Sequence, residues 1–329
     1  MQALEIRSDN RSVTFLKSIW RNYSVLVVFI GIIGICAIAA PRFILIDNLL
    51  NILRNTSTVG AIALGMTFVI IAGGIDLSSG PVMATAGAVL ILLQRMVSAD
   101  GSPAMPLIVP ILACVAVATS FGFLNGIIIT KAKLPPFIVT LAVGIMARSL
   151  VMYFMRGATV MGNNIPQFTG IGNGSVLSLP IPFILVVGVA VIFHVLLTRT
   201  KFGTYVFAVG GNENAARYSG INVDRIRIAT YMIVGLCTGM AATIEMSRMA
   251  AVAAATSGSQ YEFEAITAVI VGGTSLSGGR GRLIGSIVGF IILGIVNNMM
   301  IMLNISPYLS GAVKGAVILF AVLMQRRER

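Results

Sequence analysis

Few residues of this chain have a type and spacing that could support chemistry. Four polar residues, Asn125, Thr140, Asn297 and Asn298, stand inside long apolar segments, and Asp76 stands between two such segments. Neutral groups of this kind can hydrogen-bond a polar solute, and a buried acid can hold an ion or a proton. The sequence has no nucleophile elbow, no His–Glu pair at metal spacing, no phosphate-binding loop and no paired carboxylates inside an apolar segment. We therefore predict no catalytic residue, no metal site and no cofactor, and a chain that is not an enzyme.

The composition explains why charged groups are so scarce. Of the 329 residues, 57% are hydrophobic and 10% are charged, against roughly 25% charged in an ordinary soluble domain. A water-soluble globule is therefore excluded. The net charge of +12 is scattered between apolar stretches, a pattern typical of topology signals and of contact with anionic lipid rather than nucleic acid. Cys36, Cys114 and Cys237 lie within apolar stretches and are expected to be buried without forming disulfides.

The apolar stretches predict an all-α, polytopic integral membrane protein of about ten transmembrane helices. The expected spans are residues 24–40, 58–72, 81–93, 106–130, 136–155, 181–198, 228–246, 265–271 extended backward, 283–303 and 307–324. A bilayer core needs about 20 apolar residues in a helix, so 81–93 and 265–271 are too short to cross it. We interpret these two as broken helices among other helices, or as spans whose polar ends lie in a protein-lined cavity.

The distribution of Lys and Arg predicts the orientation. With an even number of crossings and both termini in the cytoplasm, most basic loop residues face the cytoplasm, as the positive-inside rule requires. Those left outside are Arg42, Arg54, Arg95, Arg156 and Arg248. We expect a cytoplasmic segment over residues 1–23, a transmembrane domain over 24–324 and a cytoplasmic tail over 325–329. Residues 25–39 could pass for a signal peptide, and we interpret them as an uncleaved first helix.

An internal repeat is the most informative pattern in the chain. Residues 73–80 (GGIDLSSG) align with residues 272–279 (GGTSLSGG), pairing Gly73 with Gly272, with identity at five of eight positions. In both copies a β-branched apolar run leads into the glycine pair. Helices interrupted by glycine at matching positions in two halves indicate the pathway of a transporter. The expected span count makes the two copies parallel.

Asp76 admits two compatible interpretations. As an ionisable group at membrane depth it is a candidate pathway residue, and its position just before a helix also suits capping of that helix. The neutral residues suit hydrogen bonds between helices or to a passing solute. The predicted translocation pathway comprises Asp76, Ser78, Ser79, Asn125, Thr140, Ser275, Ser277, Asn297 and Asn298.

The substantial polar stretch on the expected cytoplasmic side spans residues 199–227. Asn212 can cap a short helix over residues 213–218, and Gly220 can end it. A short surface helix between glycine turns suggests a docking element for a cytoplasmic partner, although a structured connector would look the same. The predicted docking residues are Gly210, Gly211, Asn212, Glu213, Ala215, Ala216, Arg217, Gly220 and Ile221.

Four blocks of sequence together resemble a known family. Residues 73–78, 136–141, 210–221 and 272–279 are similar to the permease subunits of bacterial ATP-binding-cassette importers for monosaccharides, the ribose permease type. The resemblance covers nearly the whole chain. In that class a cytoplasmic loop with a Glu-Ala-Ala, three residues, Gly pattern docks on the ATPase. Here residues 214–216 (NAA) followed by Gly220 keep the spacing and have Asn in place of Glu.

The resemblance implies a set of partners and a mechanism. Two permease chains, identical or paralogous, would form the pathway. A cytoplasmic ATPase would bind ATP and drive alternating access, and a periplasmic binding protein would deliver the sugar. Two other classes stay open from the residues alone. An ion-coupled secondary transporter would also explain a repeat with broken helices and would use Asp76, and a channel or membrane scaffold is the third.

Overall fold

The computed structural model describes residues 40–96, 104–163 and 165–306, together with isolated positions at 34 and between 309 and 319. The expected terminal segments 1–23 and 325–329 lie outside the described residues, as does most of the expected spans 24–40 and 307–324. Within the described part, nearly all regular structure is helical. The α-helices are α2 (Ile46–Ile71), α3 (Ser79–Gln94), α4 (Ile108–Lys131), α5 (Pro136–Phe154), α6 (Pro166–Asn173), α7 (Ile181–Arg199), α8 (Lys201–Gly211), α9 (Glu213–Tyr218), α10 (Val223–Met249), α11 (Tyr261–Val271) and α12 (Leu283–Met302).

The all-α, polytopic membrane class is confirmed. In the described part, six helices are long and apolar enough to cross a membrane, namely α2, α4, α5, α7, α10 and α12. The two segments predicted to be too short form the 16-residue α3 and the 11-residue α11. At 1.5 Å per residue, α3 is about 24 Å long, below the roughly 30 Å of a bilayer core. Both short helices are packed among longer ones, since α3 contacts α4, α5 and α10, and α11 contacts α2 and α12.

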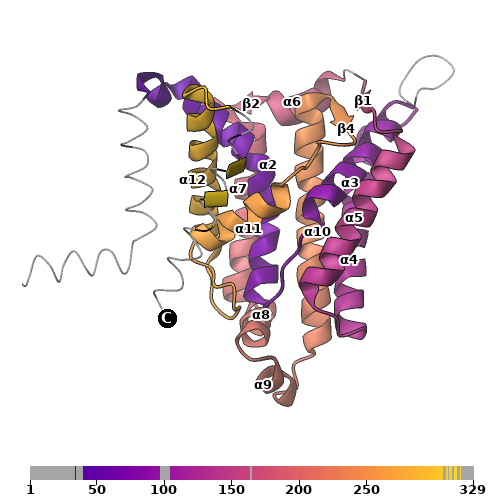
Figure 1. The fold of residues 1–329 in the computed structure, drawn as a ribbon, viewed down its shortest axis with the longest axis vertical. Coiled ribbons are helices and arrows are strands. Elements are labelled where there is room, and N and C mark those ends of the chain that lie inside the picture. The colour runs from indigo at the N-terminus through magenta and orange to yellow at the C-terminus, as the bar shows by residue number, and fades with distance from the viewer. Residues whose placement is uncertain are drawn as a thin grey trace, which may run out of the picture.

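The helices form an elongated bundle with two distinct ends (Figure 1). Helices α2, α7, α11 and α12 lie on one side, α3, α4 and α5 on the other, and α10 packs against both α2 and α4. One end carries α8 and α9, and we call it the α9 end. The opposite end, the α6 end, carries α6, η1 (Pro41–Ile44) and the strands β1 (Thr159–Met161), β2 (Ser175–Val176), β3 (Leu179–Pro180) and β4 (Ala251–Ala253). Strand β1 pairs with β4 and β2 with β3, both antiparallel.

Glycines bring α4 and α10 into backbone contact. Each helix has two glycines four residues apart, Gly122 and Gly126 on α4 and Gly235 and Gly239 on α10. A Cβ on Gly235 would lie 2.6 Å from the Ala118 carbonyl oxygen, so no side chain fits between the helices there. Small residues at this spacing are what close association of membrane helices requires. The α4–α10 pair is therefore a tightly packed unit within the bundle.

The sequence repeat is also a repeat of structure. Gly73 (φ 79°) follows the cap of α2 and Gly273 (φ 85°) follows the cap of α11, and each takes the left-handed conformation that ends a helix. The same two backbone hydrogen bonds close both helices. In the first copy, Gly73 N donates to Ile70 O (3.0 Å) and Gly74 N to Val69 O (2.8 Å). In the second copy, Gly273 N donates to Ile270 O (2.9 Å) and Thr274 N to Val269 O (3.1 Å).

Two details of the predicted repeat can now be settled. The structural match pairs Gly73 with Gly273, one residue beyond the sequence alignment, which paired it with Gly272. The alignment followed residue identity, whereas the helix caps depend on the position with positive φ. Both glycine loops lie at the α9 end, where Gly279 N donates to Ile71 O at 2.8 Å. The two copies therefore run in the same direction at their caps, as the span count predicted.

The sequence predicted the presence of the long helices better than the residues at which they begin. Helix α2 begins at Ile46, twelve residues before the expected start at 58, and α10 begins at Val223 rather than 228. These first turns carry polar residues, and a search for apolar stretches passes over them. Helix α6 was not predicted, because its sequence, PQFTGIGN, contains two glycines and a proline.

Candidate functional site

A polar cluster lies inside the bundle where α3 begins. The Asp76 carboxylate Oδ1 accepts hydrogen bonds from the Ser78 backbone N–H (2.7 Å) and the Ser78 hydroxyl (2.6 Å). The Asn125 amide on α4 donates to the same hydroxyl at 2.8 Å. All three residues are buried. The residue that caps α3 is Ser78, without a side-chain cap hydrogen bond, and Asp76 binds that residue rather than the helix itself. Asn125 makes the interhelical hydrogen bond expected of a buried amide.

The cluster has unused hydrogen-bonding capacity. The Ser79 hydroxyl and the Asn125 Oδ1 are buried without a hydrogen-bond partner in the described structure, and so is Oε2 of Glu262 on α11. That Glu262 oxygen lies against Gly80, where a Cβ would collide with it. Buried polar atoms normally have partners. This group of atoms is therefore suited to a polar ligand or to water.

Two charged residues, Arg148 and Glu262, lie near this cluster and were not among the predicted pathway residues. Arg148 donates to the carbonyl oxygens of Ala254 (2.8 Å) and Ser257 (2.9 Å). The charges of Arg148 and Glu262 interact with each other. The signal that could have found both is the presence of an ionisable residue in or beside an apolar helix.

The other predicted pathway residues lie elsewhere. Thr140 is buried on α5, and its hydroxyl donates to Pro136 O within the same helix rather than to a neighbour. Asn298 on α12 exchanges amide hydrogen bonds with Asn48 on α2, at 2.8 and 3.1 Å. Asn297 is half-buried on α12. Ser275 and Ser277 lie in the loop between α11 and α12, at the α9 end. The structure therefore unites four of the nine residues, Asp76, Ser78, Ser79 and Asn125.

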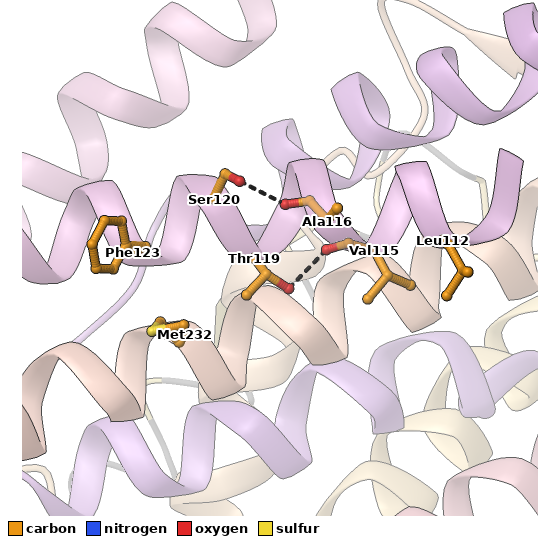
Figure 2. Close-up of a pocket in the computed structure, with 7 residues that line it drawn as sticks. All are labelled: Leu112, Val115, Ala116, Thr119, Ser120, Phe123 and Met232. Atoms are coloured by element: carbon orange, nitrogen blue, oxygen red, sulfur yellow. Dashed lines mark hydrogen bonds between the residues drawn. The ribbon is translucent and has the colours of Figure 1, made fainter. Parts of the chain in front are cut away.

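An open groove on the outside of the bundle is not suited to a sugar (Figure 2). It has a volume of about 600 Å³, lies between α4 and α10, and is lined by Leu112, Val115, Ala116, Thr119, Ser120, Phe123 and Met232. Its two hydroxyls, on Thr119 and Ser120, donate to carbonyls of their own helix at 2.7 and 2.8 Å. The surface left in the groove is apolar, as expected where a helix pair faces lipid.

The predicted surface helix is present at the α9 end with the predicted bounds. Helix α9 spans Glu213–Tyr218, and the Asn212 side chain caps it by accepting a hydrogen bond from Ala215 N at 2.9 Å. Gly220 (φ 80°) closes it in the same way that Gly73 closes α2. Asn212 is also the C-cap residue of α8. Gly210 and Gly211 are therefore the last two residues of α8, and only Asn212 separates them from α9. Of the remaining docking residues, Ala216 is buried and Ile221 is half-buried.

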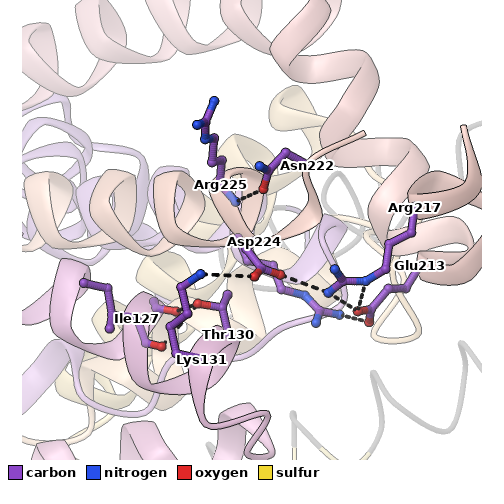
Figure 3. Close-up of polar contacts among 10 residues, drawn as sticks. Ile127, Thr130, Lys131, Glu213, Arg217, Asn222, Asp224 and Arg225 are labelled. Carbon is purple, nitrogen blue, oxygen red and sulfur yellow. Dashed lines mark hydrogen bonds and ion pairs between the residues drawn. The ribbon is translucent and has the colours of Figure 1, made fainter. Parts of the chain in front are cut away.

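An ion-pair network holds α9 against the α4–α10 pair (Figure 3). Arg217 binds both Glu213 (3.1 Å) and Asp224 (2.9 Å). Arg227 on α10 binds Glu213 at 2.6 Å, and Lys131 at the end of α4 lies 3.6 Å from Asp224. Partial burial alone would raise the pKa of Glu213, but hydrogen bonds and charge from Arg217 and Arg227 outweigh it and lower that pKa. Glu213 therefore stays ionised, and the network stays intact, at neutral pH.

The outer face of α9 is free for a partner. The Tyr218 side chain is 92% exposed, the largest aromatic group at this end of the described structure with that degree of exposure. Asn214, Ala215 and Arg217 are exposed beside it. Tyr is among the residues that contribute most to protein–protein binding. A capped, clamped helix that presents an exposed Tyr has the features of a docking element.

Fold and site together indicate a multi-pass membrane transporter, with short helices around a buried polar cluster and a capped, exposed helix at one end. The family model described as "Branched-chain amino acid transport system / permease component" matches residues 48–322. The chain belongs to this permease family, and it is the transmembrane permease component of a carbohydrate ABC importer rather than an enzyme.

Individual relatives are similar over almost their full length. The ribose import permease protein RbsC of Bacillus subtilis is 40% identical, covering 100% of this chain and 99% of the relative. The L-arabinose transport system permease protein AraH of Escherichia coli is 35% identical over 94% and 92% of the two chains. The D-allose transport system permease protein AlsC of Escherichia coli is 32% identical over 93% and 92%. No solved structure matches this chain.

Proposed function

We propose that this permease imports a monosaccharide across the bacterial inner membrane, powered by a separate ATPase. The relatives are named for ribose, L-arabinose and D-allose, which are all neutral sugars rich in hydroxyl groups. Neutral hydroxyl and amide side chains, such as Ser78, Ser79 and Asn125, suit such a solute because they exchange hydrogen bonds without a charge. The chain itself needs no cofactor in this scheme, because ATP is bound by the partner.

The observation that carries the proposal is α9, a docking helix capped at both ends, clamped by ion pairs and exposed on its outer face. We assign the segment 199–227 as the coupling loop that contacts the ATPase. With this assignment the α9 end is cytoplasmic, and the cytoplasmic location of both termini stays a prediction from the distribution of Lys and Arg. A sugar-binding protein then docks at the α6 end, and a second permease chain completes the pathway.

The polar cluster at the start of α3 is the proposed contribution of this chain to the pathway. Ser79 Oγ and Asn125 Oδ1 have no partner in the described structure, so they can bind a hydroxyl when the helices around them separate. Closure of the ATPase pair pulls on the coupling loops and changes the side to which the cavity opens. Each nucleotide state must therefore bind differently to the permease, because otherwise ATP could not shift its conformation.

Reconstitution tests the proposal. The permease, its ATPase and its binding protein are assembled in liposomes, and uptake of radiolabelled ribose, L-arabinose, D-allose, xylose and galactose is measured with and without ATP. We expect uptake of one sugar or a few, strictly dependent on ATP. A Tyr218→Ala variant should weaken ATPase binding by about tenfold or more, the effect of losing an interface anchor, without changing permease stability.

Two results would contradict the proposed function. Uptake driven by a proton or sodium gradient in liposomes without the ATPase would replace this function with secondary transport. Wild-type affinity of the Tyr218→Ala variant for the ATPase would remove α9 from the interface. Phe123→Ala is a matched control, since it removes an exposed aromatic ring from the outside of the bundle, away from α9.

A further inference from the structure

Three segments that are distant in the sequence touch through backbone atoms at the α9 end. They are the end of α2, the end of α8 and the loop between α11 and α12. Glycine occupies the contact positions in all three. We call these residues the glycine joint: Gly73, Gly210, Gly211, Gly278 and Gly279.

The distances leave no space for side chains. A Cβ on Gly278 would lie 2.7 Å from the Gly210 carbonyl oxygen and 3.0 Å from the Gly73 Cα. A Cβ on Gly279 would lie 2.7 Å from the Gly211 Cα, and a Cβ on Gly210 would collide with the Ile71 carbonyl. Real Cβ atoms do not approach other atoms this closely. The joint therefore depends on glycine at Gly210, Gly278 and Gly279.

We infer that the glycine joint transmits the displacement of α9 to both copies of the repeat, which makes Gly210, Gly278 and Gly279 positioning residues for transport. The inference rests on the proposed function, in which α9 receives the movement of the ATPase. Only Asn212 separates α8 from α9, so a shift of α9 moves Gly210 and Gly211. These glycines abut the end of α2 and the loop that follows α11, the two sites of the repeated cap.

The joint differs in kind from the ion pairs on the other side of α9. Arg217 and Lys131 are exposed, and exposed pairs are weak and screened by salt. Backbone-to-backbone contact has no side-chain rotamers that could absorb a displacement, and packed interfaces shift between discrete arrangements rather than deforming continuously. The end of α8 thus contacts α2 and the α11–α12 loop through backbone atoms, whereas α9 contacts α10 through side chains, which include the partly buried Arg227–Glu213 pair.

Two adjacent glycines provide a matched experiment. Gly210→Ala and Gly211→Ala both place a methyl group in the last turn of α8, where Ala is a better helix former than Gly. The methyl group at 210 meets the Ile71 carbonyl, whereas the one at 211 has no atom within 4 Å. In the reconstituted complex we expect Gly210→Ala to import about tenfold less sugar per ATP hydrolysed than Gly211→Ala, which places the same methyl group in the same coupling segment without a contact.

The ratio of uptake to hydrolysis separates transmission from stability, since a merely unstable variant loses both activities together. A wild-type ratio in Gly210→Ala overturns the inference. If the wild-type permease neither binds an ATPase nor shows ATP-dependent uptake, the proposed function itself fails, which is a different result.

A second measurement leaves the joint unchanged and does not depend on the folding of Gly210→Ala. Spin labels on Ser219→Cys and Leu276→Cys report the distance between the end of α9 and the α11–α12 loop, and labels on Ser219→Cys and Lys133→Cys report the distance to the α4–α5 connection. All three positions are exposed. On ATP binding we expect the first distance to stay constant and the second to change. A change in the first distance contradicts rigid transmission.

Discussion

The Asp76 carboxylate has a structural role that can be tested separately from a role in transport. Its Oδ1 accepts two hydrogen bonds from Ser78, which in turn accepts one from Asn125, so the acid fixes the start of α3 against α4. That role needs an acceptor oxygen and does not need a charge. An ion-coupled transporter would need the charge itself, because its acid must bind the coupling ion or proton.

Substitution of Asp76 separates the two requirements. Asp76→Ala leaves the Ser78 N–H and hydroxyl without their acceptor, and we expect the free energy of unfolding to fall by about 2–4 kcal/mol. Asp76→Asn keeps an acceptor oxygen, so its loss should be smaller and ATP-driven uptake should persist. Denaturant titration in mixed micelles and uptake in liposomes measure the two effects. Equal stability of the two variants would contradict the hydrogen-bonding role, and a stable Asp76→Asn without uptake would show that the charge is required.

At the level of elements, local chemistry made some features predictable. Helix α9 was predicted to the residue, because Asn212 and Gly220 mark its ends through their own backbone and side-chain hydrogen bonds. The polar starts of α2 and α10 were missed, since hydropathy reports the lipid-exposed or buried part of a helix only. The residues of the polar cluster were identified singly, but their assembly was not. The Asn125–Ser78 contact depends on the packing of α3 on α4, which no local pattern specifies.

The packing of α4 on α10 gives a prediction at the same scale. Gly235→Leu would drive a side chain into the α4 backbone, 2.6 Å from the Ala118 carbonyl and 2.9 Å from the Thr119 Cα. Backbone cannot repack as a side chain does, so we expect a loss of about 3 kcal/mol or more in stability. The yield of monodisperse protein and its melting temperature provide the measurement. Gly188→Leu on α7, where no atom lies within 4 Å, is the control and should leave both unchanged.

The whole molecule has two chemically different ends. The α9 end has the exposed helix α9, an ion-pair network and the glycine joint, while the α6 end has short strands and α6 across the ends of the long helices (Figure 1). The end of α8 contacts α2 through glycines, and α9 forms ion pairs with α10, whose Asp224 also pairs with Lys131 of α4. The α8–α9 segment therefore contacts both sides of the bundle, which is what the proposed coupling function needs.

The proposed orientation is tested by labelling both ends. Leu177 at the α6 end is 94% exposed, and Tyr218 at the α9 end is 92% exposed. Single variants Leu177→Cys and Tyr218→Cys are made in a Cys36→Ser background, because the remaining Cys114 and Cys237 are buried. In spheroplasts a membrane-impermeant maleimide should label Leu177→Cys alone, and permeabilisation should expose Tyr218→Cys. Labelling of Tyr218→Cys in intact spheroplasts would place the α9 end outside and exclude a cytoplasmic ATPase there.

The hydrogen bond from Gly279 to the Ile71 carbonyl also bears on how the protein is made. The last carbonyls of a helix have no partner within it, and one at the end of α2 receives its donor from a residue far later in the chain. Because the ribosome synthesises the N-terminal part first, α2 and α8 emerge before the loop that joins them exists. The three-way contact is thus completed late in biogenesis, and a nascent chain that stops before residue 279 lacks both α12 and the hydrogen bond that Gly279 donates to the end of α2.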